Sequence, residues 1–156
     1  MMEGFIIPQI CSERRRKQLI KECPPFLENL DEGEYPGRQT SANLHHNVKY
    51  RTFFLDLCTL IKDKSGLDVD ISKSWINLTK GKKNDMGWHR HYNCEYAGVY
   101  YIKTLPFFSN GTLFKHGMVR SPQNSLLVFP SKLWHTAPTC PFPFSRYTMG
   151  MDLVVR

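Results

Sequence analysis

Three histidines in the second half of the chain, His89, His91 and His135, are the first candidates for chemistry. His89 and His91 are two residues apart in a segment predicted to be a strand, and alternate residues of a strand point to one face. Imidazole binds iron, zinc, copper and nickel, and His135 could supply a third ligand from a distant strand. A His-x-His pair alone is weak evidence for a metal site, because surface or hydrogen-bonded core histidines are common. The neighbouring motifs must decide between these possibilities.

Arg146 follows His135 by eleven residues, and Thr148 comes two positions later, on the same face of the last predicted strand. A buried guanidinium beside a metal pocket suits a carboxylate, because it donates two parallel charge-assisted hydrogen bonds. The threonine hydroxyl can add a third. The alternative is that Arg146 pairs with an acidic side chain on the surface.

The elements that must position these residues begin with two helices. Ser12 is suited to cap the first, which should end near Pro24. Residues 32–41 are rich in Gly, Pro and charge and predict a loop. An apolar stripe over residues 48–61, stopped near Gly66, predicts the second helix.

From about Leu67 onward, β-branched and aromatic runs are separated by turn residues, which predicts strands. The expected strands cover residues 69–79, 86–92, 96–104, 112–119, 124–129, 133–137 and 146–155. Helices followed by strands indicate an α+β, mainly β fold, and a short β module of this spacing should close as a sandwich or barrel. We expect a single domain, residues 1–156, in which residues 1–66 form a helical support and residues 67–156 the β-barrel core.

Composition narrows the class of protein. No apolar stretch is long enough to cross a membrane and no signal peptide is evident, so no membrane association and a cytoplasmic location are expected. The five cysteines form no C-x-x-C pair and are expected to be reduced thiols. The formal net charge of +7 is concentrated in residues 14–17 and 80–83, which favours solvated surfaces over any particular partner.

Several short motifs occur together in one order. They are W-x-N (Trp75, Asn77), H-R-H (89–91), A-G-V-Y-Y-I (97–102), L-V-F-P-S (127–131), W-H (134–135) and R-Y-T (146–148). In this order the motifs resemble the prolyl-hydroxylase-like branch of the 2-oxoglutarate- and Fe(II)-dependent oxygenases. The chain is particularly similar to uncharacterised bacterial and phage members with W-x-N, H-x-H and S-G-V-Y-Y motifs. The resemblance covers about half of the chain.

This resemblance implies a double-stranded β-helix, also called a jelly roll, with Fe(II) at one end and 2-oxoglutarate and O2 as cosubstrates. His89 and His135 would be iron ligands, and Arg146 would bind the distal carboxylate of 2-oxoglutarate. Three further residues are carried over to the cosubstrate: Tyr101, whose hydroxyl would donate to that carboxylate, Asn77 on the strand before the first metal ligand, and Thr148 in the R-x-S/T pattern. The reaction implied is hydroxylation, with decarboxylation of 2-oxoglutarate to succinate.

The chain departs from the family at His91, where an aspartate or glutamate is usual. A site with three histidines would carry one negative charge less than a site with two histidines and a carboxylate. Glu95 is the alternative third ligand, and Asp85 a weaker one.

Three other functions remain open. His89, His91, Glu95 and His135 also resemble a cupin metal motif, which would give no role to Arg146 or Tyr101. A nucleic-acid-binding module would use the basic runs with aromatics such as Phe107 and Phe108. A zinc hydrolase would use similar ligands, but no general base stands out near the histidines.

The primary substrate is not encoded in any motif. Loops at residues 104–111 and 136–145 should select it, and a protein side chain, a nucleobase or a small metabolite would all be compatible. The prolyl-hydroxylase likeness favours protein slightly. Trp88, Tyr92 and Trp134 are candidates for the pocket rim, or equally for packing.

Overall fold

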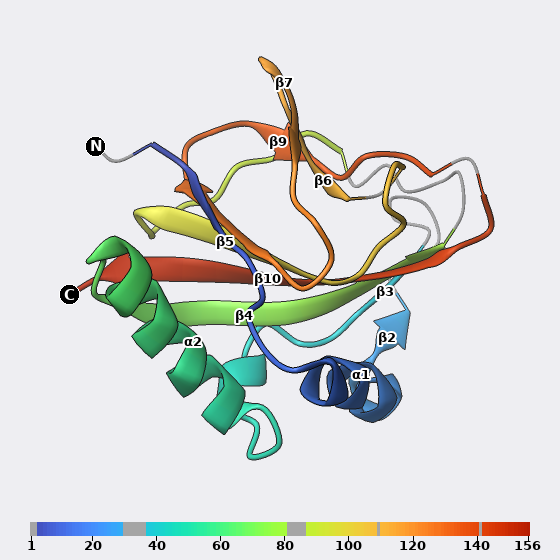
Figure 1. Cartoon of the computed structure of the whole chain (residues 1–156), viewed down its shortest axis with the longest axis horizontal. Coiled ribbons are helices and arrows are strands. Elements are labelled where there is room, and N and C mark those ends of the chain that lie inside the picture. Colours follow the sequence, from blue (N-terminus) through green and yellow to red (C-terminus); the bar gives the residue numbers. More distant parts are fainter. Residues whose placement is uncertain (1–2, 30–36, 81–86, 109, 141) are drawn as a thin grey trace.

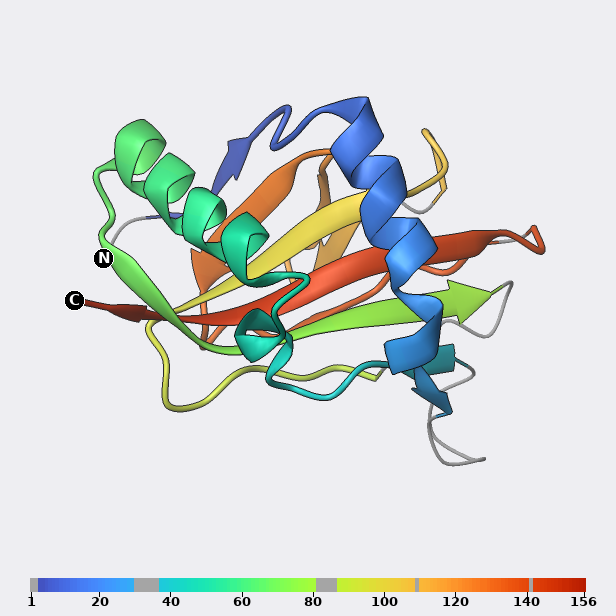
Figure 2. The same cartoon turned by 90° about the horizontal axis from the view of Figure 1, so that it is seen from below.

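Two β-sheets face each other, and two helices cover the outer face of the larger sheet (Figures 1 and 2). The computed structural model describes residues 3–29, 37–80, 87–108, 110–140 and 142–156. The larger sheet has seven strands in the order β1-β8-β5-β10-β4-β3-β2, and the smaller has the order β7-β6-β9. All strand pairs are antiparallel. The α+β, mainly β prediction is therefore confirmed.

The elements have the following bounds. The helices are α1 (Glu13–Glu22) and α2 (Arg51–Ser65), with 3-10 turns at Pro24–Phe26 and Leu44–His46. The strands are β1 (Phe5–Ile7), β2 (Glu28–Asn29), β3 (Gly37–Gln39), β4 (Val69–Lys80), β5 (Tyr96–Lys103), β6 (Gly111–Phe114), β7 (Gly117–Arg120), β8 (Leu126–Pro130), β9 (His135–Thr136) and β10 (Ser145–Val155).

Local signals define both helices. The Ser12 side chain accepts a hydrogen bond from the Arg15 amide at 3.2 Å and caps α1. Helix α2 ends at Gly66, whose φ of 75° is accessible to glycine without strain. No helix among the described residues is long and apolar enough to span a membrane.

Strand β10 separates two cores by the alternation of its side chains. Met149, Met151 and Leu153 pack with α2 in the main hydrophobic core. Arg146, Thr148 and Gly150 face the opposite way and line a cavity between the sheets. A second, smaller core lies beside this cavity, formed by Ala97, Tyr101, Phe114, Leu127 and Phe129.

The strand expected over residues 86–92 is wrong for its described part, residues 87–92. Only an isolated bridge forms there, between His89 and His135. Gly87 and Asn93 have φ angles of 69° and 62°, which turn the backbone out of the extended conformation at both ends. The histidine pair therefore sits on an irregular segment fastened to the smaller sheet.

Other expected strand limits also differ. Residues 112–119 form two strands, β6 and β7, joined by a tight turn that ends at Gly117 with φ 133°. The strand expected at 133–137 shrinks to β9. The expected loop at 32–41 contains β3, and residues 30–36 lie outside the described part.

The N-terminal part is not only a helical support. It also contributes β1, which pairs with β8, and β3, which pairs with β4. Such short strands complete the backbone hydrogen bonds of longer neighbours and leave little periodicity in the sequence. The expectation of one domain over residues 1–156 stays a prediction.

Candidate metal centre and cosubstrate pocket

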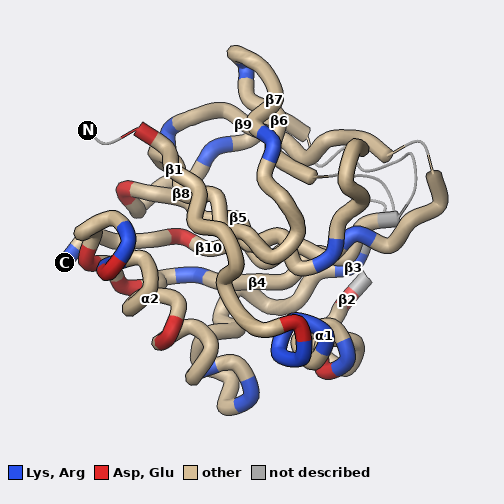
Figure 3. The backbone as a smooth tube through the Cα atoms, viewed as in Figure 1, with Lys and Arg blue, Asp and Glu red and all other residues tan. Residues whose placement is uncertain are grey.

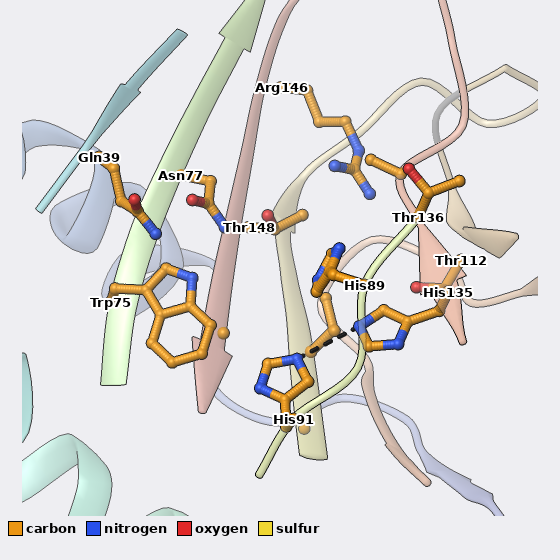
Figure 4. Close-up of a pocket in the computed structure, with 14 residues that line it drawn as sticks. Gln39, Trp75, Asn77, His89, His91, Thr112, His135, Thr136, Arg146 and Thr148 are labelled. Atoms are coloured by element: carbon orange, nitrogen blue, oxygen red, sulfur yellow. Dashed lines mark hydrogen bonds between the residues drawn. The ribbon is translucent and has the colours of Figure 1, made fainter. Parts of the chain in front are cut away.

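The three predicted histidine ligands meet at one end of the cavity between the sheets (Figure 4). One ring nitrogen from each of His89, His91 and His135 lies within 4.8 Å of the other two. His91 Nε2 and His135 Nε2 are 3.3 Å apart. The backbones of His89 and His135 exchange two hydrogen bonds, of 3.0 and 2.9 Å, which fix the irregular segment against β9.

The Nδ1 atom of each histidine has a hydrogen-bond acceptor. His89 Nδ1 lies 3.0 Å from the Gly87 carbonyl oxygen, and His135 Nδ1 lies 2.9 Å from that of Leu133. A carbonyl oxygen can only accept, so in both rings Nδ1 carries the proton and Nε2 presents a lone pair. His91 Nδ1 lies 2.6 Å from Asp152 Oδ1, which orients this ring in the same way.

Two ring nitrogens this close need a proton or a metal ion between them, because lone pairs directed at one another repel. The close approach of His91 Nε2 and His135 Nε2 is thus one expected of metal ligands whose outer nitrogens are held by hydrogen bonds. Burial lowers the pKa of His135 to about 4, the hydrogen bond to Leu133 only partly opposing it, and burial also lowers the pKa of His89. At neutral pH both imidazoles are neutral and able to bind a metal.

The cavity has a volume of about 300 Å³, at the small end of the range for ligand pockets. Arg146 is 2% exposed and lies with Thr136 at the end away from His91 (Figure 4). Its Nη2 donates to the Gly111 carbonyl oxygen at 3.2 Å. Complete burial lowers the pKa of Arg146, but a guanidinium remains charged at physiological pH.

Two buried polar atoms without partners lie in the described residues that line the same cavity. Within the described part of the chain, Asn77 Oδ1 and Thr136 Oγ1 have no hydrogen-bond partner, and both residues line the cavity. Buried polar groups are usually paired, so these atoms indicate a polar ligand. Thr148, from the same face of β10 as Arg146, also lines the cavity.

Tyr101 lies behind the cavity wall and is not among the residues that line it. It is fully buried, and its hydroxyl is hydrogen-bonded to Thr112 Oγ1, a residue that does line the cavity. The Arg146 guanidinium carbon lies 5.8 Å from the centre of the Tyr101 ring. Burial raises the pKa of Tyr101 to about 12, so the hydroxyl stays protonated. Its direct donation to a cosubstrate stays a prediction.

The alternative third ligands are not part of the histidine group that the structure describes. Glu95 is exposed, and its Oε2 accepts from the Val155 amide at 2.9 Å. Asp85 lies outside the described residues. A carboxylate that no sequence motif predicted, Asp152, lies behind His91 and is hydrogen-bonded to its Nδ1. The sequence feature that could have pointed to Asp152 is a charged residue within the apolar end of the last strand.

The three aromatic rim candidates are exposed and do not line the cavity. Lys115 Nζ lies 3.8 Å from the centre of the Trp88 ring. The Arg90 guanidinium lies 5.2 Å from the Tyr92 ring and 5.1 Å from the Trp134 ring. They form cation–π contacts on the surface beside the metal ligands.

Solved structures with a similar fold include 2-oxoglutarate-dependent enzymes, and the predicted double-stranded β-helix is confirmed. HygX from Streptomyces hygroscopicus, solved with nickel and 2-oxoglutarate, has a TM-score of 0.72 at 10% identity, over 97% of this chain and 82% of HygX. A Pseudomonas putida prolyl-4-hydroxylase has a TM-score of 0.70 at 13% identity, over 99% and 93% of the two chains. The viral collagen prolyl hydroxylase of Paramecium Bursaria Chlorella virus-1 has a TM-score of 0.68 at 10% identity, over 97% and 96%.

At such identities the likeness shows the fold alone. No protein-family model and no curated protein sequence matches the chain.

Proposed function

We propose that this protein is a 2-oxoglutarate- and Fe(II)-dependent oxygenase that hydroxylates its substrate. His89, His91 and His135 would hold the iron, and Arg146 would bind the distal carboxylate of 2-oxoglutarate. The observation that carries the proposal is one small cavity with three convergent imidazoles at one end and a buried guanidinium at the other. Bound iron would activate O2, which is the oxidant, and 2-oxoglutarate would supply two electrons through its decarboxylation to succinate.

The cavity residues fit a dicarboxylate. The buried guanidinium of Arg146 would compensate one of the two negative charges of the dicarboxylate. The N–H donors of the guanidinium can hold one carboxylate through two parallel hydrogen bonds. Asn77, Thr136 and Thr148 offer further polar contacts around the same end. Tyr101 would support this end of the cavity through its hydrogen bond with Thr112. Because the raised pKa keeps its hydroxyl protonated, Tyr101 adds no negative charge beside the cosubstrate.

A cupin-type metal protein or dioxygenase that does not use 2-oxoglutarate is the second candidate. It needs the three histidines and shares the barrel, but it gives no role to Arg146 in the wall of the ligand cavity. A guanidinium in that position suits a carboxylate ligand, which favours the oxygenase.

The primary substrate is proposed to be a protein side chain such as proline. Three of the similar structures are prolyl hydroxylases, whereas another similar structure of HygX contains hygromycin B. The exposed aromatics Trp88, Tyr92 and Trp134 beside the metal ligands offer flat surfaces on which a proline-containing peptide can pack.

Succinate formation tests this proposal. Purified protein with Fe(II), O2 and 2-oxoglutarate should release succinate, and a library of proline-containing peptides should include members that accelerate the release and gain one oxygen atom by mass spectrometry. His135→Ala should abolish both products, and Arg146→Gln should require far more 2-oxoglutarate.

The charge-matched control is Arg14→Gln, an exposed position on α1, which should behave as wild type. Oxygen incorporation that needs iron but is indifferent to 2-oxoglutarate and to Arg146→Gln would contradict the proposal and support the cupin alternative.

A further inference from the structure

Asp152 is a buried carboxylate directly behind one of the proposed metal ligands. Its side chain is 6% exposed and that of His91 is 12% exposed. Asp152 Oδ1 lies 2.6 Å from His91 Nδ1, so the hydrogen bond is short and shielded from water. Because Nδ1 is engaged, Nε2 of His91 is directed toward His135 and the centre of the histidine group.

We propose that Asp152 is a positioning residue for the metal, and that the pair of His91 and Asp152 takes the place of a carboxylate ligand. The inference depends on the proposed metal centre. Asp152 acts through His91: it sets the direction of the His91 ring and supplies a negative charge to the site.

The contacts around His91 hold this ring in one orientation. Its plane is nearly parallel to the ring of Trp75, at 14° and 5.8 Å between centres, and to the ring of His135, at 7° and 5.1 Å. Gly150 allows Trp75 to take this place, because a Cβ on Gly150 would lie 2.5 Å from the indole. Asp152 adds the hydrogen bond that holds Nδ1 on the side away from the histidine group and so leaves Nε2 facing it.

Asp152 is itself held in a rigid place. It lies on β10 between β4 and β5, opposite Lys73 and Ala97, at the point where the register with β4 shifts. A buried carboxylate is costly unless it is hydrogen-bonded, so His91 and Asp152 stabilise each other's place in the fold.

The charge balance explains why a third histidine can serve here. Three neutral imidazoles contribute no charge, whereas two imidazoles and a carboxylate contribute one negative charge. With Asp152 the unit of three imidazoles and one carboxylate again carries one negative charge, placed one ring further from the metal. A carboxylate bonded to the outer nitrogen of a histidine also makes that imidazole a more basic ligand.

The test measures Co(II) affinity by competition with a chelator, together with the visible spectrum of bound Co(II). Asp152→Asn keeps the size of the side chain and an acceptor oxygen but removes the charge, and it should weaken Co(II) binding about 10-fold to 100-fold and shift the spectrum. Asp63→Asn, the same change at an exposed position on α2, is the matched control and should leave both unchanged.

A double-mutant cycle separates action through His91 from general support of the fold. In the His91→Ala background, Asp152→Asn should change Co(II) affinity by less than about twofold, because the path to the metal has already been removed. A loss of equal size in both backgrounds, or wild-type affinity in Asp152→Asn alone, would overturn the inference and leave the proposed function standing. If wild type binds Co(II) no better than His135→Ala, the metal centre itself is wrong, and the inference fails with it.

Discussion

At the scale of single residues, burial determines the state of the proposed ligands. His135 is 4% exposed, and burial lowers its pKa to about 4, so it stays neutral over the range in which an exposed histidine becomes charged. The Nδ1 partners of the three histidines turn their Nε2 atoms inward. The site is thus prepared for a cation before one is bound.

This burial predicts that acid destabilises the metal-free protein. In the unfolded chain His135 titrates near pH 6.5, and in the folded chain near 4. Between these values the unfolded state binds more protons, so the free energy of unfolding should fall as pH drops from 6.5 toward 4, by about 1.4 kcal/mol per pH unit for this one group. Urea unfolding of metal-free protein at several pH values measures this change in the free energy of unfolding.

His135→Gln is the control for that measurement. Glutamine keeps polar atoms at the position but does not titrate, so the variant should show a shallower fall in the same pH window. Identical slopes in wild type and variant would show that His135 is not the group responsible.

A second residue-scale prediction concerns Gly150, which stands opposite Trp75 in the pairing of β10 with β4. In Gly150→Ala the new Cβ would meet the indole at 2.5–2.7 Å, so Trp75 must leave its place beside His91. The expected cost is about 1–3 kcal/mol in the free energy of unfolding, with weaker metal binding.

Gly98→Ala is the comparison, because its Cβ would meet the Met151 side chain at 2.8 Å. Methionine is flexible and can move, so this change should cost less and leave metal binding intact. Equal losses in the two variants would contradict the role given to Trp75.

At the scale of elements, strand β10 was predictable and the irregular segment of residues 87–92 was not. Alternation in residues 146–155 placed Arg146 and Thr148 on one face, and the structure has both in the cavity wall. The same alternation places Asp152 on that face, but its partner could not be read from the sequence, because His91 is 61 positions away on an irregular segment. Strands β1, β2 and β3 were missed because they have only two or three residues each, too few to show a period in the sequence.

The structure brings His89 and His91 together as expected, but the strand that was expected to do so does not form over residues 87–92. We expected His89 and His91 to converge because alternate residues of a strand share a face. The structure holds them instead by backbone hydrogen bonds from His89 to His135 and from His91 to Ser131. These hydrogen bonds to distant residues, and not the alternation of a strand, bring the two histidines together. Such long-range contacts leave no periodicity in the local sequence.

At the scale of the whole molecule, helices, large sheet and small sheet form successive layers, and the cavity lies between the sheets. The basic run on α1 lies on the other side of the large sheet (Figure 3). One of its members, Arg16, is buried and bonded to Glu13 and to the Ile102 carbonyl oxygen. The run is thus partly structural and remote from the candidate site, and residues 81–83 of the second run lie outside the described part of the chain.

Anaerobic titration of the Fe(II)-loaded protein with 2-oxoglutarate tests the central claim most directly, because it needs no primary substrate. Chelation of iron by 2-oxoglutarate should produce a visible charge-transfer band in wild type. The band should be lost in His135→Ala, and Arg146→Gln should need at least about 10-fold more 2-oxoglutarate, since a charge-assisted pair contributes about 1.5–3 kcal/mol. Iron binding without a band, unchanged in Arg146→Gln, would contradict the assignment of this cavity to 2-oxoglutarate.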